Sequence, residues 1–303
     1  MFSIFLLVGW SMKSLASKMR LAAMLIAVLS LAKAVPVHAA GPAVAQAGRA
    51  AEKSAGGLQS HRAVYDIALT KISNSDGVRA ATGTMTYTLT DRCEGYTVES
   101  NLIMTLAMAN GNVNKVDQRY AAWEAKDGKS STFRMQALEN GKVNKAYSGN
   151  IQFKDDGIGT ATYQGDETTK FDLPRGTLLS TAHTQALLKS AAAHEKFVSR
   201  MVIDGSFDEG PFWVTASIAG PHDNNVKPAK NGPNKNGAEA PGAQFWPIAL
   251  AYFPAKSSQT LPEYEIAQNL LSSGVTRSMS QDFGGFTLAF NLVRIEPITL
   301  PPC

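Results

Sequence analysis

The sequence has few cysteines and no cluster of basic residues. Cys93 and Cys303 are its only thiols, too few for a miniprotein framed by disulfides, and they form no C-x-x-C redox pair. All the net charge of +4 resides in residues 1–39, which contain three lysines, one arginine and no acidic residue. The neutral remainder offers little to neutralise phosphates, which argues against a nucleic-acid binder. With 303 residues and 44% hydrophobic composition, the chain is globular and suits one large domain or two ordinary ones.

The N-terminal 39 residues are typical of a secretory signal peptide. Lys13, Lys18 and Arg20 precede an apolar segment, Leu21–Leu31, that is shorter than the roughly 20 residues needed to span a membrane. Short side chains near Ala39 predict cleavage after that residue. Translation from Met1, Met12 or Met19 is compatible with this pattern, and the alternative is an uncleaved signal anchor. We expect an exported chain with no stable membrane span after cleavage.

Export makes a disulfide between the two cysteines the favoured interpretation. Oxidising compartments preserve such bonds, whereas the alternative is a pair of reduced thiols. A Cys93–Cys303 bond would close a loop of about 210 residues, and the chain-entropy model gives it roughly 5 kcal/mol. It would also hold the C-terminal end of the chain in place.

Residues 40–57 are rich in alanine and glycine and are predicted to be a flexible leader. From His61 the pattern alternates with a period of two, which predicts strands. Turn residues recur every 10 to 16 positions or so, as in an antiparallel meander that continues to about residue 173. Further strands are predicted at 196–203, 212–219, 245–253, 264–271, 275–282 and 286–295.

One helix interrupts the strands. Ser180 or Thr181 is the predicted N-cap, residues 182–194 are the predicted helix, and Leu179, Ala182, Ala186, Leu187 and Ala191 would form its apolar stripe. Residues 221–242, rich in asparagine, proline and glycine, are predicted to be a flexible loop. Because strands flank both segments, we expect residues 58–303 to form one mainly β domain, without the βαβ alternation of Rossmann or TIM-barrel folds.

No motif in the sequence identifies a catalytic or metal site. The histidines left after cleavage are not spaced as metal ligands, and no G-x-S-x-G elbow occurs. The pairs Asp155–Asp156 and Asp208–Glu209 lie in glycine-containing turns. Glu263 and Glu265 would lie about 7 Å apart on one strand face, close to a glycosidase separation, but the wet face of a strand is the more common explanation. The aromatic residues of the strands are expected in the core, with some open to an apolar groove: Trp123, Phe212, Trp213, Phe245, Trp246 and Phe253.

Four segments in order resemble the EipB-type cell-envelope integrity proteins of alphaproteobacteria. The first two are an opening strand at residues 58–69 and Cys93-Glu94-Gly95-Tyr96. The other two are residues 173–184, which contain Leu173-Pro174 and His183, and the turn Asp204-Gly205. The resemblance covers roughly residues 58–303, with Cys303 matching the second half-cystine of the family.

The resemblance implies a periplasmic β-spiral, which is a strongly curved, incompletely closed antiparallel sheet with a helix near its opening. Such a fold is similar to the lipoprotein carriers of the outer-membrane sorting pathway. The family is associated with envelope integrity and has no assigned enzymatic activity. Its structural disulfide corresponds to Cys93 and Cys303, and it supplies no catalytic residues.

We therefore expect a non-enzymatic protein without cofactor that binds a lipid, a lipoprotein or a periplasmic protein in its concave sheet. The first alternative is a hydrolase of envelope glycans that uses Glu263 and Glu265 or His183. The second is an interaction module that docks a protein through a sheet edge or through the loop at 221–242. His61 and His183 are predicted to be buried and hydrogen-bonded.

Overall fold

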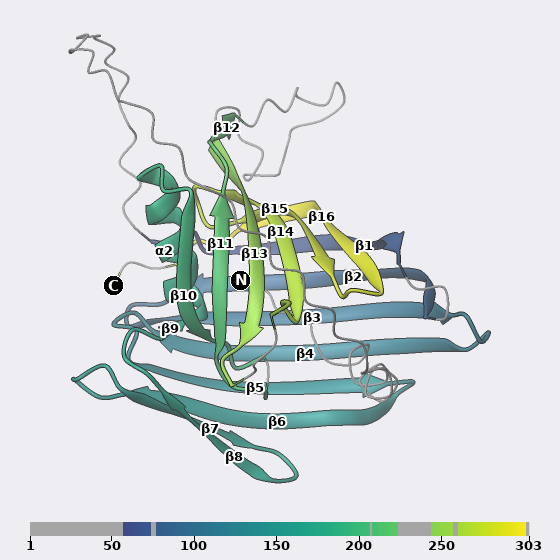
Figure 1. Cartoon of the computed structure of the whole chain (residues 1–303), viewed down its shortest axis with the longest axis horizontal. Coiled ribbons are helices and arrows are strands. Elements are labelled where there is room, and N and C mark those ends of the chain that lie inside the picture. The colour runs from purple at the N-terminus through teal and green to yellow at the C-terminus, as the bar shows by residue number, and fades with distance from the viewer. Residues whose placement is uncertain (1–56, 74–76, 207, 224–243, 257–259, 301–302) are drawn as a thin grey trace, which may run out of the picture.

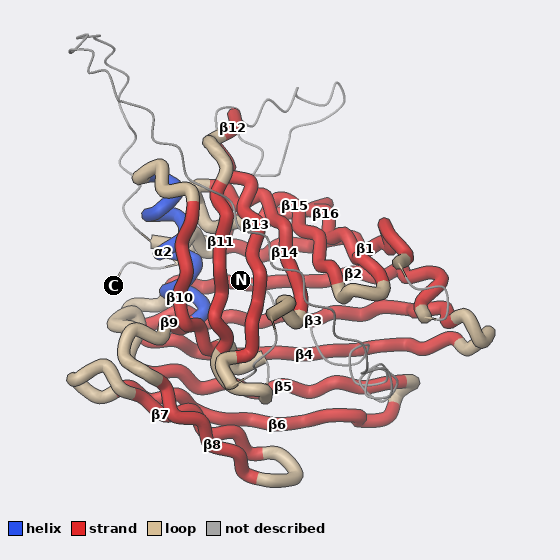
Figure 2. Tube along the Cα trace, viewed as in Figure 1, coloured by secondary structure: helices blue, strands red, loops and turns tan. Residues whose placement is uncertain are grey.

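A computed structural model describes residues 57–73, 77–206, 208–223, 244–256, 260–300 and 303. Within these ranges, sixteen strands form one continuous sheet, and one helix lies beside it (Figures 1 and 2). The predicted signal peptide, the leader up to residue 56 and nearly all of the predicted loop at 221–242 lie outside the described residues. No helix within the described ranges is long and apolar enough to cross a membrane.

Neighbouring strands in the sheet run in the order β8-β7-β6-β5-β4-β3-β2-β1-β16-β15-β14-β13-β11-β10-β9, and β12 pairs with β13. All these pairings are antiparallel except that of β9 with β10. The first group comprises β1 (His61–Ile72), β2 (Val78–Asp91), β3 (Gly95–Met108), β4 (Val113–Ala125), β5 (Ser130–Glu139), β6 (Lys142–Phe153), β7 (Gly159–Gln164) and β8 (Thr168–Leu173). The second comprises β9 (Leu178–Leu179), β10 (Phe197–Ile203), β11 (Phe212–Ile218), β12 (His222–Asp223), β13 (Gln244–Pro254), β14 (Tyr264–Leu271), β15 (Thr276–Asp282) and β16 (Phe286–Pro297).

Period-two alternation accounts for these strands. In β2, for example, Met85, Tyr87 and Leu89 are buried, whereas the intervening Thr86 and Thr88 are partly exposed. Threonine suits the outer face because its branched Cβ favours extended backbone while its hydroxyl tolerates solvent. The predicted turns link the strands of the first group, and at the β5–β6 turn Asn140 and Gly141 both take positive φ, 52° and 79°.

The two groups of strands cross, so the curved sheet folds over itself. Figure 1 shows β10, β11, β13 and β14 standing in front of the horizontal β2 to β6. A single core cluster contains buried side chains from both groups, among them Met85 and Leu102 from the first and Val214, Leu250 and Leu288 from the second. A second cluster, around Phe133 and Tyr163, fills the curve of β4 to β8. The apolar face of the sheet is thus the inside of the molecule. The described part of the chain is mainly β with one central helix, as the sequence pattern predicts, and its sheet is strongly curved, as the family resemblance implies.

The second cluster depends on a glycine. Phe133 of β5 and Tyr163 of β7 lie on strands separated by β6, yet their ring centroids are 4.8 Å apart. Gly149 of β6 lies between them in register, and a Cβ added there would lie 2.5 Å from the Phe133 ring. The missing side chain therefore lets two aromatic rings meet across the intervening strand.

Helix α2 (Ser180–Ala192) begins and packs differently from the prediction. Its N-cap is Leu179, whose side chain makes no capping hydrogen bond, rather than Ser180 or Thr181. The predicted stripe is only partly right: Leu187 and Ala191 are buried on the helix, but its other buried residues are polar (Thr181, His183, Thr184 and Ser190). The helix ends at Ala192, and His194, which the prediction included, takes a positive φ of 59°.

The N- and C-terminal strands meet in the middle of the sheet. β1 pairs with β2 on one side and with β16 on the other, from His61 opposite Pro297 to Ile72 opposite Phe286. Beyond β16, the Ile298 N–H donates to the carbonyl of Ser60 at 3.0 Å. Cys303 forms a disulfide with Cys93, in the turn between β2 and β3, with their Cα atoms 5.6 Å apart.

Candidate functional site

The candidate site is an open trough of about 1320 Å³ on the face of β1 to β7 that points away from the core, with charged, polar and apolar residues in its lining. The sheet registers place side chains of seven neighbouring strands in one cross-strand row along it. This row runs Arg62, Thr88, Glu99, Ala121, Arg134, Ser148 and Gln164. A parallel row contains Thr86, Asn101, Arg119, Gln136 and Ala146.

Charges of both signs line the trough. The lining contains three arginines and three carboxylates: Arg62, Arg119 and Arg134, and Glu99, Asp166 and Glu296. The Arg119 guanidinium donates to both carboxylate oxygens of Asp117, at 3.1 and 2.7 Å, and this ion pair raises the pKa of Arg119. Arg62, Glu99 and Arg134 form no ion pair with any other described residue. Three charged side chains of the first row thus remain available to a ligand.

Strand β4 separates the trough from the core. Arg119 and Ala121 point into the trough, whereas Tyr120, Ala122 and Glu124 point to the opposite, inner face. The inner face carries its own polar group, because Glu124 is 3% exposed. Because side chains alternate along a strand, neighbouring residues of β4 line the trough and the buried interior.

Glu124 caps helix α2 from β4. Its Oε2 accepts the backbone N–H of Thr181 at 2.8 Å and the Thr181 hydroxyl at 2.5 Å. A carboxylate at a helix N-terminus satisfies an otherwise unpaired donor and lies at the positive end of the helix dipole. Burial nevertheless raises the pKa of Glu124, while the two hydrogen bonds from Thr181 oppose that shift.

A second carboxylate lies at the same helix end. Asp204 Oδ1 accepts the Ser206 N–H at 2.8 Å, and its Oδ2 is 3.5 Å from the Ser180 hydroxyl. Burial raises the pKa of Asp204, and its charge contributes to the raised pKa of Glu124. Glu124 was missed in the sequence, although a signal existed: it occupies the inward phase of β4 with Val116 and Ala122.

The predicted histidines are buried in separate places. His61 is 2% exposed, and its Nδ1 lies 2.7 Å from the Gln59 carbonyl, as predicted for a buried, hydrogen-bonded residue. Burial is the main cause of its lowered pKa. His183 is 1% exposed, but the prediction of a hydrogen bond is wrong for it, because neither ring nitrogen has a partner among the described residues. Burial lowers the pKa of His183 to about 3, so the ring stays neutral and inaccessible.

The acidic pairs form no common site. Glu265 is exposed on β14 and Glu263 is half-buried just before that strand, while His183 is enclosed in the core. The turn carboxylates form surface contacts instead: Asp155 pairs with Lys129 at 2.8 Å, and Asp208 pairs with Lys145 at 2.5 Å. Among the described residues, no group of three histidine, cysteine or acidic side chains could hold a metal ion.

The aromatic residues divide between core and surface. Phe212 and Trp246 are buried as expected, at 3% and 7% exposure. Trp213 is 48% exposed because its position in β11 points outward. Trp123, Phe245 and Phe253 are half-buried, and the Trp123 indole covers Gly95 on the neighbouring strand, on the same face of the sheet as the trough.

Comparisons with known proteins give related sequences and a solved structure with a similar fold. The profile of the EipB-like family matches residues 52–299. The cell envelope integrity protein EipB of Brucella abortus is 29% identical over 252 residues, which cover 82% of this chain and 88% of that protein. The crystal structure of a beta-barrel-like protein with a domain of unknown function, also from Brucella abortus, superposes with a TM-score of 0.71 at 27% identity. It covers 80% of this chain and 99% of that one. With a family match over most of its length and a curved sheet with one helix in the part that the structure describes, the chain belongs to the EipB-like family.

Proposed function

We propose that this chain is a non-enzymatic periplasmic protein that supports cell-envelope integrity by binding another envelope component in its trough. The name of the Brucella relative supports the envelope role, and the signal-like residues 1–39 support export. The observation that carries the proposal is the open trough with three charged side chains, Arg62, Glu99 and Arg134, that form no ion pair within the described part of the chain. Concave sites with a few convergent polar groups are the usual places where proteins bind ligands.

A concave apolar sheet would be expected to bind an acyl chain. The packing of this sheet favours instead a partner that binds in the trough on its outer face. The apolar side chains of this sheet are buried against one another, and Leu187 and Ala191 of α2 belong to the same core cluster. An acyl chain there would have to displace the protein's own side chains, which would lose close-packed contacts. Binding on the polar face requires no such rearrangement.

The hydrolase alternative lacks a supporting arrangement. A glycosidase needs two carboxyl groups that flank one bond, with the acid partly desolvated. Glu265 is exposed on the outer face of β14, and the trough lies on other strands. The two carboxylates whose pKa burial raises, the buried Glu124 and the half-buried Asp204, are both engaged at the N-terminus of α2.

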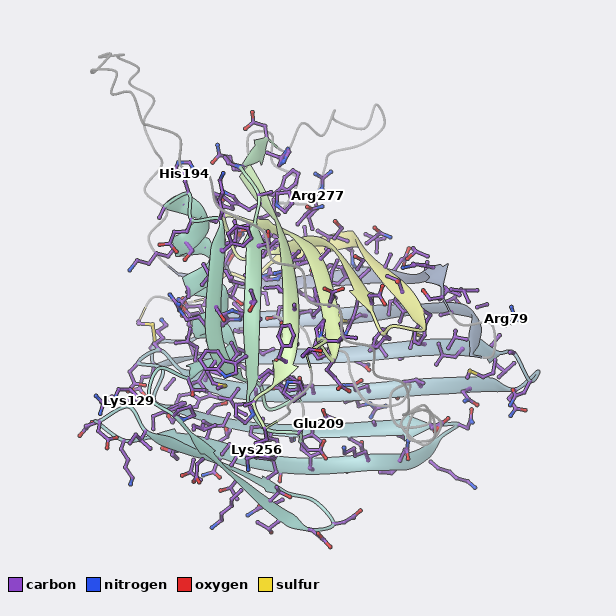
Figure 3. All side chains as sticks on the ribbon, in the orientation of Figure 1. Arg79, Lys129, His194, Glu209, Lys256 and Arg277 are labelled. Carbon is purple, nitrogen blue, oxygen red and sulfur yellow. A yellow bond between two sulfur atoms is a disulfide. The ribbon has the colours of Figure 1, made fainter. Side chains whose placement is uncertain are left out.

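Complementation of a deletion strain tests the proposal. Cells would be challenged with detergent and with cell-wall antibiotics while expressing the wild-type chain, the trough double variant Asn101→Ala/Arg134→Ala, or Glu263→Gln/Glu265→Gln. We expect the trough variant to lose rescue and the glutamate variant to retain it. Arg79→Ala is the matched control, since this exposed arginine lies at the far end of β2 (Figure 3). Full rescue by the trough variant would contradict the proposal, and loss of rescue by the glutamate variant would favour the hydrolase.

A further inference from the structure

The chemistry of the trough lining narrows the class of ligand. We propose that the trough binds an extended, neutral or zwitterionic oligosaccharide, such as a glycan strand of the envelope. This inference rests on the proposed function and adds the substrate class of the same site. It is carried by the length of the trough, the balance of its charges, its hydrogen-bonding side chains and the small residues among them.

The length of the trough suits a chain-like ligand. Its first row crosses seven strands, and neighbouring strands lie about 4.8 Å apart, so the row spans roughly 29 Å. Its volume of about 1320 Å³ exceeds the roughly 300–1000 Å³ of most small-molecule pockets. A ligand that fills it therefore has several units, each comparable in size to the spacing of one or two strands.

The charge balance excludes polyanions. Three arginines and three carboxylates share the lining, and Asp117 already neutralises Arg119. In the first row, Glu99 lies two strands from Arg62 on one side and two strands from Arg134 on the other. A nucleic acid or a polyphosphate would meet the Glu99 carboxylate midway between the two arginines of this row and would be repelled. A ligand with hydroxyl and amide groups can instead accept from both guanidinium groups and donate to the carboxylate.

The uncharged side chains add donors and acceptors at regular intervals. Asn101, Gln136 and Gln164 each present a carboxamide, which can donate and accept at the same time, and Thr86, Thr88 and Ser148 contribute hydroxyls. Sugar rings carry hydroxyls around their edges, so paired donor and acceptor groups match them well. The apolar part of the lining comes from residues such as Ala121, Ala146, Pro297 and Ile298, since Met135 and Tyr147 are only 2% and 6% exposed.

Small side chains in the trough and an indole beside it suit the apolar faces of sugar rings. Ala121 and Ala146 contribute little bulk to the lining. Two residues along β4 from Ala121 and beside the lining, the half-buried Trp123 covers Gly95, where an added Cβ would approach the indole to 2.6 Å. An aromatic plane beside planar polar groups can stack on the apolar C–H face of a sugar ring. A peptide gains less here, because the face of a sheet offers none of the unpaired backbone groups that β-strand addition uses.

Titration calorimetry with defined oligosaccharides tests the inference. The probes are dimers and hexamers of β-1,4-linked N-acetylglucosamine, with cello-hexaose as the hexamer that lacks acetamido groups. We expect saturable binding of a hexamer, at least tenfold tighter than that of the dimer, because only the longer chain contacts most of the row. Asn101→Ala and Arg134→Ala should each weaken binding about tenfold, since each removes hydrogen bonds of roughly 1.4 kcal/mol in total. Arg79→Ala should change the affinity less than twofold.

Cosedimentation with cell-wall sacculi and with purified outer-membrane polysaccharide then distinguishes two sources of this chemistry, and retention by either supports the inference. No saturable binding of any glycan, or unchanged affinity of the Asn101→Ala and Arg134→Ala variants, overturns it. Binding of a fluorescent fatty acid or of a peptide that is lost in Arg134→Ala, with no binding of any glycan, overturns it in favour of that ligand. If trough variants lose rescue in cells while no glycan binds, the proposed envelope role stands and the glycan assignment falls.

Discussion

Removing the carboxylate of Glu124 should loosen the N-terminus of helix α2 from the sheet. In Glu124→Ala, the Thr181 N–H and hydroxyl both lose their acceptor inside the protein. Each buried donor left unsatisfied costs about 1–3 kcal/mol, for a total of roughly 2–6 kcal/mol. Relief from burying a charge returns part of this cost at neutral pH. We expect a net loss of about 2–4 kcal/mol, or roughly 4–16 °C in Tm for a domain of this size.

Glu124→Gln separates the hydrogen bond from the charge. Its side-chain oxygen can still accept from Thr181, but it never ionises. The folded protein holds the Glu124 proton more tightly than the unfolded chain does, because burial raises the pKa of Glu124 above its ordinary 4.5. The stability of the wild type therefore falls as pH rises from 4.5 through the folded-state pKa, and this contribution is absent from the variant. The glutamine variant should gain relative to wild type across that window.

Urea denaturation at pH 4, 6 and 8 with the disulfide intact measures both effects, and hydrogen exchange at the Thr181 amide reports the helix end directly. Glu99→Gln is the control, because this exposed glutamate on the neighbouring strand β3 should change stability by less than about 0.5 kcal/mol. A loss below 0.5 kcal/mol in Glu124→Ala would refute the capping role. Equal stability differences between Glu124→Gln and wild type at pH 4 and pH 8 would refute the raised pKa.

Three further perturbations have defined outcomes. Cys93→Ser/Cys303→Ser opens a loop of 210 residues and should lower the free energy of unfolding by about 5 kcal/mol by the chain-entropy model, as measured by urea denaturation. Recovery of both thiols in alkylatable form from the unreduced wild type would contradict this bond. His183→Leu should make the free energy of unfolding depend less on pH at acid pH. The ring has a folded pKa of about 3 and an ordinary value of 6.5, so the wild type loses stability as pH falls between these values, by up to about 1.4 kcal/mol per pH unit. Parallel curves of stability against pH for variant and wild type would count against a neutral buried ring. Gly149→Ala should destabilise by about 1–3 kcal/mol, because the new methyl group meets the Phe133 ring and the Thr162 carbonyl, and an unchanged Tm would disprove that tight contact.

The strands were predictable because their signals are local. Alternation in β2 and the turn residues Asn140-Gly141 depend only on near neighbours in sequence. The start of helix α2 was not predictable in this way. Ser180 and Thr181 have the chemistry of N-caps, but Glu124, 57 residues away from Thr181 in sequence, supplies the acceptor and allows Leu179 to occupy the cap position.

The trough was out of reach of the sequence for a related reason. Arg62, Glu99 and Arg134 read singly as solvated positions on strand faces, and only the register across five strands brings them into one row. Register depends on pairing between strands distant in sequence, which one sequence without structure does not specify. Glu263 and Glu265 show the converse, because their spacing drew attention to chemistry although Glu265 lies on an exposed strand face.

The pairing of β1 with β16 constrains when this protein can fold. β1 is the first of the described strands to be made and β16 is the last, yet they pair along most of their length. Contacts of such long sequence separation form slowly, because the intervening chain must be closed into a loop first. The central seam therefore stays incomplete until β16 has been made, and the two groups of strands cannot join into one sheet before then.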